Sequence, residues 1–254
     1  MADRSQSLWI KRFHPSPNTG IRLACLPHAG GSASYFLPVS KSLARECEVL
    51  SVQYPGRQER RLEPCIVEIG ELAQRVAAEL AEWADQPLAI FGHSMGSVLA
   101  FEVTRILEAN GIQPVALFVS GRRAPSATRV AAMHLLPDSE LIKAIRSMEG
   151  TSESLLNDDE MIQLILPTIR SDYRAIESYR YTPSPAISAP IHAFIGDRDP
   201  QVSEDEADDW RHHTKSEFTL NVYTGGHFYL NTHAQRVISF IGTILAKEIH
   251  SVDR

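Results

Sequence analysis

Short apolar runs alternate with amphipathic stretches along most of this chain. Most of the apolar runs end at Pro or Gly, as strands buried on both faces of a parallel sheet do. The predicted strands span residues 8–13, 21–26, 48–54, 88–91, 115–120, 191–195 and 218–222. Apolar residues at helical spacing predict helices over residues 35–44, 69–83, 97–108, 139–148, 203–212 and 234–249. This alternation predicts an α/β fold with a mostly parallel central sheet and helices on both faces.

The alternation breaks between residues 126 and 187, a stretch much longer than a usual connection. The helix over residues 139–148 is predicted to stop at Gly150, and a second helix to begin after the N-cap residues 157–159. Pro167 is predicted to kink or break that helix before a third one. We interpret residues 126–187 as a helical lid inserted into a single domain that spans residues 1–254. An acyl chain would suit its apolar residues.

Composition narrows the class of protein. No apolar run reaches the roughly 18 residues of a membrane-spanning helix, and residues 1–7 lack the apolar core of a signal peptide, so we expect a cytoplasmic protein without membrane contact. The net charge of −6 disfavours nucleic-acid binding. The three cysteines lack metal-ligand spacing, so we expect reduced thiols and no metal site. A monomer is expected.

One motif carries chemistry in a context that specifies it. Gly92-x-Ser94-x-Gly96 joins the strand at residues 88–91 to the helix at 97–108. A serine on such a sharp strand-to-helix turn is a nucleophile elbow, which lifts the hydroxyl above the sheet. The glycines two positions before and after Ser94 allow the crowded turn. The sequence therefore predicts that Ser94 is a nucleophile.

A serine nucleophile needs a base, and the base needs an orienting acid. In folds with this elbow the order along the chain is Ser, Asp or Glu, then His. His227 lies in a Gly-rich loop after the last predicted strand and is the predicted base. The acid is Asp199 or Asp197, which share one strand-exit loop; Pro200 would stiffen the turn at Asp199 and favours that residue.

Two backbone N–H groups are expected to bind the developing oxyanion. The helix after the elbow points its first N–H groups at the site. The loop at residues 27–34 is Gly-rich but lacks the Lys of a phosphate-binding loop. Beside an elbow, such a loop supplies the second donor, which we assign to Ala29.

Basic residues gather on the strand-exit loops that should surround Ser94. They are Arg57, Arg60, Arg61, Arg122 and Arg123. One interpretation is a local basic rim that contacts a phosphate or an acidic carrier protein despite the net negative charge. The alternative is ordinary solvated arginines paired with Glu59 or Glu63.

Five motifs together resemble one family, the type II thioesterases of polyketide synthases and nonribosomal peptide synthetases. They are residues 26–33, 54–57, 92–96, 196–200 and 225–228. The resemblance implies an α/β-hydrolase fold and hydrolysis of aberrant acyl groups from the phosphopantetheine arm of acyl or peptidyl carrier proteins. It implies no cofactor beyond the arm that carries the substrate. It also places the acid at Asp199 and supports Ala29 and Met95 as oxyanion donors.

Other functions remain open from the residues alone. The three catalytic residues do not separate thioesters from the oxygen esters of a carboxylesterase or lipase. An acyltransferase or cyclising thioesterase would differ only in what resolves the acyl-serine. A non-catalytic binding protein with this fold is disfavoured because Ser94, Asp199 and His227 form a complete set.

Overall fold

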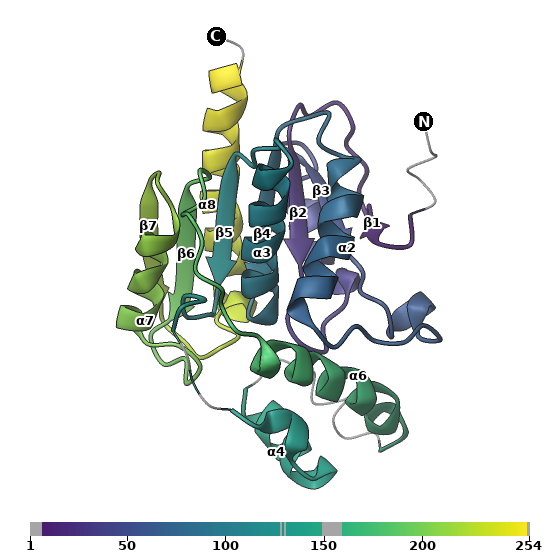
Figure 1. Ribbon diagram of the computed structural model, residues 1–254. Coiled ribbons are helices and arrows are strands. Elements are labelled where there is room, and N and C mark those ends of the chain that lie inside the picture. Colours follow the sequence, from purple (N-terminus) through teal and green to yellow (C-terminus); the bar gives the residue numbers. More distant parts are fainter. Residues whose placement is uncertain (1–6, 128, 130, 149–158, 253–254) are drawn as a thin grey trace.

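A seven-stranded sheet forms the centre of the protein in the computed structural model, which describes residues 7–127, 129, 131–148 and 159–252 (Figure 1). The strand order is β1-β3-β2-β4-β5-β6-β7. The strands are β1 (Ile10–Lys11), β2 (Arg22–Leu26), β3 (Glu48–Val52), β4 (Leu88–His93), β5 (Ala116–Ser120), β6 (Ile191–Gly196) and β7 (Phe218–Tyr223). Only the edge strand β1 runs antiparallel to its neighbour, so the prediction of a mostly parallel sheet is confirmed.

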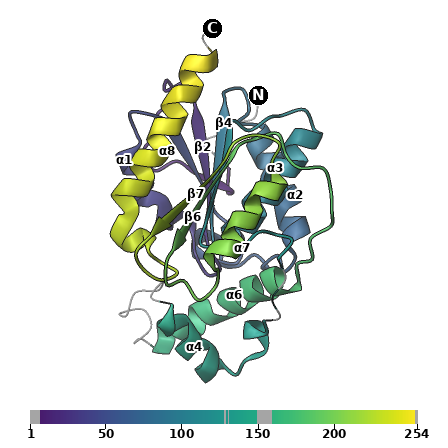
Figure 2. The same cartoon turned by 90° about the vertical axis from the view of Figure 1, so that its left-hand side faces the viewer.

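Helices cover both faces of this sheet. Figure 2 shows α2 (Ile69–Ala81) and α3 (Met95–Ala109) on one side, and α1 (Leu37–Ser42) and α8 (Leu230–Val252) on the other. Alternate side chains of each strand enter one core or the other, as the pleat requires. On β4, Ile90 faces the core under α2 and α3, whereas Phe91 faces the core under α1 and α8.

Two further helices lie across the carboxyl ends of the strands (Figures 1 and 2). They are α4 (Asp138–Ser147) and α6 (Asp159–Ser178), and they pack together through Leu141, Ile162 and Leu166. This is the place predicted for the lid. Gly150 and residues 157–158, which mark the predicted helix ends, lie outside the described residues.

The prediction of a break at Pro167 is wrong, because α6 continues through it as one helix. A proline in a helix removes one N–H donor and crowds the carbonyl four residues earlier. Here Pro167 is exposed, so water reaches that carbonyl. Leu166 and Ile169 beside it are buried, and their packing stabilises the helix before and after the proline. The predicted alternative of a kink stays a prediction.

Other helix ends shift by a few residues. The predicted helix over residues 203–212 is α7 (Glu204–Asp208) followed by a 3-10 helix at Asp209–His213. Ser203 and Glu206 form a capping box that starts α7. Among the described residues, no helix combines the length and the apolar character needed to cross a membrane.

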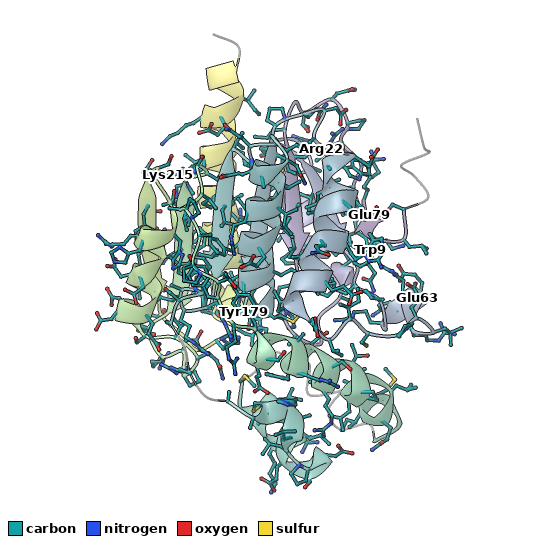
Figure 3. All side chains as sticks on the ribbon, in the orientation of Figure 1. Trp9, Arg22, Glu63, Glu79, Tyr179 and Lys215 are labelled. Carbon is teal, nitrogen blue, oxygen red and sulfur yellow. The ribbon has the colours of Figure 1, made fainter. Side chains whose placement is uncertain are left out.

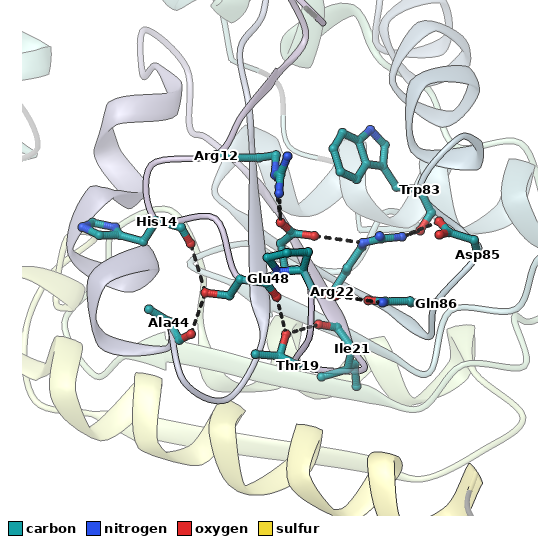
Figure 4. A network of polar contacts seen from close by, with 12 residues as sticks. Arg12, His14, Thr19, Ile21, Arg22, Ala44, Glu48, Trp83, Asp85 and Gln86 are labelled. Atoms are coloured by element: carbon teal, nitrogen blue, oxygen red, sulfur yellow. Dashed lines mark hydrogen bonds and ion pairs between the residues drawn. The ribbon is translucent and has the colours of Figure 1, made fainter. Parts of the chain in front are cut away.

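A buried polar network ties the amino ends of β2 and β3 together, at the end of the sheet away from α4 and α6 (Figure 4). Glu48 accepts hydrogen bonds from Arg12 at 2.8 Å and from Arg22 at 3.2 Å. Arg22 also pairs with Asp85, which follows α2. Ion pairs therefore stabilise the amino end of the sheet. The carboxyl end lies away from them.

Candidate active site

Ser94 occupies the turn between β4 and α3 in a strained backbone conformation. Its φ is 56° and its ψ is −116°, a region that residues other than glycine rarely adopt. A Cβ at position 92 would lie 2.0 Å from the carbonyl oxygen of Gly96, and one at position 96 would lie 2.1 Å from that of Leu26. Both glycines are therefore required for the turn to close.

Two buried serines hold the turn in place. The Ser94 N–H donates to the carbonyl oxygen of Ser120 at 2.7 Å. The Ser97 hydroxyl lies 2.9 Å from the carbonyl oxygens of both Gly92 and Ser120. Sequence reasoning missed Ser97 and Ser120, although Ser97 lies one residue past the motif and is a hydroxyl residue in the apolar first half of α3. These bonds fix the strained serine to the neighbouring strand.

The structure brings Ser94, His227 and Asp199 together from three separate loops. The Oγ of Ser94 lies 2.9 Å from Nε2 of His227, and Nδ1 of His227 lies 2.8 Å from Oδ2 of Asp199. The side chains of His227 and Asp199 are almost fully buried. Asp199 Oδ1 accepts the Gln201 N–H at 2.8 Å, which fixes the carboxylate in its loop. The spacing suits proton transfer from a serine through an oriented imidazole.

The two candidate acids have different surroundings. Asp197 is exposed, and its Oδ1 accepts the Gly225 N–H at 2.8 Å. That bond closes the loop that carries His227. Of the two, only Asp199 contacts the imidazole, and this geometry favours Asp199 as the acid in the choice that the sequence left open.

Two more histidines pack beside His227. The rings of His93 and His227 lie 5.3 Å apart, and those of His28 and His93 lie 5.8 Å apart. Burial, followed by the proximity of His227 and Arg57, lowers the pKa of His28 to about 3. Burial, and then the neighbouring histidines, lowers the pKa of His93 well below its usual value. Both rings are therefore neutral at pH 7 and add no charge beside the imidazole of His227.

A pocket of about 330 Å³ opens above Ser94 and His227. The Gly-rich loop, including Ala29, forms one wall. Apolar side chains from α4 and α6 form another; they are Ile145, Ile165, Ile169 and Tyr173. Met95 is the first residue of α3, and the first N–H groups of a helix have no partner within it. The wall from α4 and α6 suits an apolar substrate group.

The predicted basic rim needs arginines that are free to bind a partner. For Arg57 and Arg60 that prediction is wrong. Arg57 is buried and pairs with Asp172 at 2.6 Å. Arg60 is buried, pairs with Glu63 at 2.6 Å and lies 4.2 Å from the centre of the Trp9 ring. Figure 3 labels Trp9 and Glu63 at the side of the molecule where β1 lies. The alternative of solvated arginines is right about the Glu63 partner of Arg60 but wrong about solvation, because both guanidinium groups are buried.

The other three arginines of the predicted rim differ in exposure: Arg123 is buried, Arg122 is half-buried and Arg61 is exposed. Arg123 is buried and donates to the carbonyl oxygens of Ala127 and Gln201, both at 3.3 Å. Burial, and then the charge of Arg123, lowers the pKa of Arg122 to about 10. Arg61 is exposed on the loop after β3, three residues from Gln58 of the pocket wall. Of the five, Arg61 is the side chain most open to a partner.

The described residues contain no group of three or more His, Cys, Asp or Glu side chains placed to hold a metal ion. The expectation that the chemistry needs no cofactor stays a prediction.

Known proteins resemble this chain in sequence over most of its length. A family model described as a thioesterase domain matches residues 21–245. Thioesterase PikA5 of Streptomyces venezuelae is 51% identical over 237 residues, covering 91% of this chain and 84% of that protein. The gramicidin S biosynthesis protein GrsT of Aneurinibacillus migulanus is 37% identical, covering 92% of each.

Solved structures show the same similarity. The type II thioesterase BorB from the borrelidin biosynthetic cluster superposes with a TM-score of 0.90 at 48% identity, covering 94% of this chain and 98% of that one. YbtT, a type II thioesterase from the yersiniabactin pathway, superposes with a TM-score of 0.81 at 31% identity over 94% of this chain and 98% of that one.

Proposed function

This chain belongs to the thioesterase domain family, and from that premise we propose that it hydrolyses acyl groups from the phosphopantetheine arm of acyl or peptidyl carrier proteins. The acyl groups would be aberrant intermediates of polyketide or nonribosomal peptide biosynthesis, the setting of relatives such as BorB and YbtT. The observation that carries the proposal is the hydrogen-bonded series Ser94, His227 and Asp199 beneath a pocket with an apolar wall.

The mechanism follows from the orientation of the imidazole. Asp199 accepts a hydrogen bond from Nδ1–H of His227, which leaves Nε2 free to take the hydroxyl proton of Ser94. The serine oxygen attacks the thioester carbonyl and forms a tetrahedral oxyanion. The carbon–sulfur bond then breaks, the thiol leaves with the proton from His227, and an acyl-serine remains. His227 next removes a proton from water, whose oxygen attacks the ester carbonyl. The bond between the acyl carbon and the Ser94 oxygen then breaks, His227 returns the proton to that oxygen, and the acid is released.

The oxyanion would be bound by the backbone N–H groups of Met95 and Ala29. Met95 follows the nucleophile at the start of α3, and Ala29 lies in the pocket wall beside Ser94. One such donor typically contributes about 3–4 kcal/mol to the transition state. No acidic or basic side chain of the site is needed for this task.

The acyl group would contact α4 and α6, and the carrier protein would dock at the mouth of the pocket. Arg61 is the proposed contact to an acidic carrier.

We expect Arg61→Glu to lower the turnover of an acyl-carrier several-fold while turnover of the same acyl group on pantetheine is unchanged, because only the former needs docking. Lys41→Glu, which makes the same charge change at an exposed residue of α1, is the control. Equal losses on both substrates would contradict the role of Arg61.

The function is tested by loading a carrier protein with a panel of short and long acyl groups. Release is followed by intact-protein mass for the wild type and for Ser94→Ala. The wild type should restore the mass of the free phosphopantetheine arm, and Ser94→Ala should not. Full hydrolysis by Ser94→Ala would refute the site.

The same enzyme preparation separates thioesters from oxygen esters. Rates on an acyl-pantetheine thioester and on the matching aryl ester are compared at equal concentration. We expect faster hydrolysis of the thioester. A faster rate on the ester would replace the proposal with a carboxylesterase activity at the same three residues.

A further inference from the structure

Asp172 is a buried carboxylate that belongs to α6 but binds the Gly-rich loop of the pocket. Its side chain is 2% exposed. Oδ2 accepts the backbone N–H of Gly30 at 2.7 Å and Nη1 of Arg57 at 2.6 Å, while Oδ1 accepts Nη2 of Arg57 at 2.8 Å. The helix over the active face is therefore joined directly to the loop that carries Ala29.

Arg57 holds the same loop from its other side. Its Nη1 also donates to the carbonyl oxygen of Gly31 at 3.0 Å. Its guanidinium lies 5.1 Å from the centre of the Tyr54 ring, and the Tyr54 hydroxyl donates to the carbonyl oxygen of Pro27 at 3.1 Å. Burial by itself lowers the pKa of Arg57, but the charge and hydrogen bonds of Asp172 outweigh it and raise that pKa. The Arg57 guanidinium therefore keeps its charge, and it donates to both carboxylate oxygens of Asp172.

Shape fixes the loop against α6 as well. Gly30 has a φ of +74°, and a Cβ there would lie 2.6 Å from Cγ1 of Ile169. Ile169 lies almost one turn before Asp172 on the same helix. The backbone at Gly30 therefore packs directly on α6 and has no space in which to shift toward it.

Holding the N–H of Gly30 also constrains the N–H of Ala29. The two N–H groups belong to successive planar peptide units, which are joined only by the φ and ψ of Ala29. We infer that Asp172 is a positioning residue, which aims the N–H of Ala29 at the oxyanion by fixing the peptide unit of Gly30. This role rests on the proposed function, since it assigns Ala29 as an oxyanion donor.

The contribution of the Arg57–Asp172 ion pair to folding stability does not by itself explain why the pair is present. A buried ion pair replaced by apolar residues of similar volume usually leaves a protein as stable as before. An acceptor for the Gly30 N–H, by contrast, is lost in any such replacement. Catalysis and stability therefore respond differently to changes at Asp172, and the two are measured separately.

The test compares Asp172→Leu, which removes the acceptor for the Gly30 N–H, with Glu177→Leu. Glu177 lies on the same helix and accepts the N–H groups of Met133 at 2.8 Å and His134 at 3.1 Å, far along the chain from the Gly-rich loop. We expect Asp172→Leu to lower kcat roughly ten- to a hundredfold, part of the loss seen on removing an oxyanion donor. The loss should be equal on acyl-carrier and acyl-pantetheine, with KM nearly unchanged.

A second readout reports the oxyanion site directly. An alkylboronic acid adds to Ser94 as a tetrahedral adduct, one of whose oxygens occupies the oxyanion site. Its inhibition constant should rise for Asp172→Leu in proportion to the fall in kcat. For Glu177→Leu, Tm should fall while kcat and the inhibition constant stay as in the wild type.

Asp172→Leu with wild-type kcat and boronate affinity per folded molecule would overturn the inference. If that variant does not fold, the double variant Arg57→Met/Asp172→Leu replaces the ion pair with apolar side chains and is measured instead. A folded double variant with low kcat supports the inference, and one with wild-type kcat overturns it. Boronate binding to Ser94 reports on Asp172 even if the wild type hydrolyses no thioester, so failure of the proposed function is seen separately.

Discussion

At the scale of single residues, the site depends on which neighbour each side chain reaches. Asp197 and Asp199 lie two positions apart on one loop, yet one closes the loop of His227 and the other contacts its imidazole. Ser94 adopts a strained φ that is sustained by bonds to Ser120. Roles here follow from contacts within about 3 Å.

These two aspartates give the sharpest prediction. Asp199→Asn should lower kcat about ten-thousand-fold, because an amide at this place favours the wrong tautomer of His227. Asp197→Asn keeps an oxygen acceptor for the Gly225 N–H and should leave kcat nearly unchanged. Steady-state hydrolysis of an acyl-pantetheine measures both variants. The reverse order would reassign the acid.

His28 predicts a dependence of stability on pH. Its pKa is lowered to about 3 in the folded protein, whereas an unfolded histidine titrates near 6.5. Between these values the unfolded state binds more protons, so stability falls as pH falls from about 6.5 toward 3. The contribution is about 1.4 kcal/mol per pH unit at most. Urea unfolding of the wild type and His28→Gln should show a shallower decline for the variant; identical slopes would contradict this.

At the scale of elements, α6 departs most from expectation. It is one helix through Pro167, and it supplies pocket residues, packing for α4 and the acceptor for the Gly-rich loop. Burial of one apolar face, rather than the intrinsic helix propensity of its residues, determines how this helix lies.

This makes Pro167 a site where stability can be gained. Pro167→Ala restores a helical N–H donor at an exposed position, and we expect the free energy of unfolding to rise by about 1–2 kcal/mol after the entropy of the unfolded chain is counted. Pro137→Ala is the matched control, since Pro137 stands at the N-cap of α4 where no helical bond is lost. Urea denaturation compares the two variants. A destabilised Pro167→Ala would show that α6 needs the proline.

At the scale of the whole molecule, the two ends of the sheet have separate tasks. The amino ends of β2 and β3 are joined by the Glu48 network, and the carboxyl ends carry Ser94, the loops of His227 and Asp199, and the overlying helices (Figures 1 and 4). Ligand sites of open α/β sheets lie at the carboxyl ends.

Glu48→Gln tests this separation. It removes the carboxylate that neutralises Arg12 and the buried Arg22, so the free energy of unfolding should fall by about 3 kcal/mol. Because the network lies at the other end of the sheet, kcat per folded molecule should be unchanged. Urea unfolding and active-site titration with a fluorophosphonate measure the two quantities. A large loss of kcat in fully folded Glu48→Gln would show that the ends are coupled.

The sequence by itself determined the parts of this protein that depend on neighbouring residues. The strand, elbow and helix around Ser94, the order of the later loops and the choice of His227 follow from local periodicity, from glycine placement and from chain order. The resemblance of five motifs also gave the family, which the comparisons confirm.

Only the tertiary structure decided what depends on residues far apart in the chain. Asp172 meets Gly30 across 142 positions and Arg57 across 115, which removed Arg57 from the predicted rim. α6 continues through Pro167 while packing against α4 and the Gly-rich loop. The loop geometry places Asp199, rather than Asp197, in contact with His227. Sequence patterns report the propensity of adjacent residues, whereas buried ion pairs and helix packing arise only when the fold brings distant segments into contact.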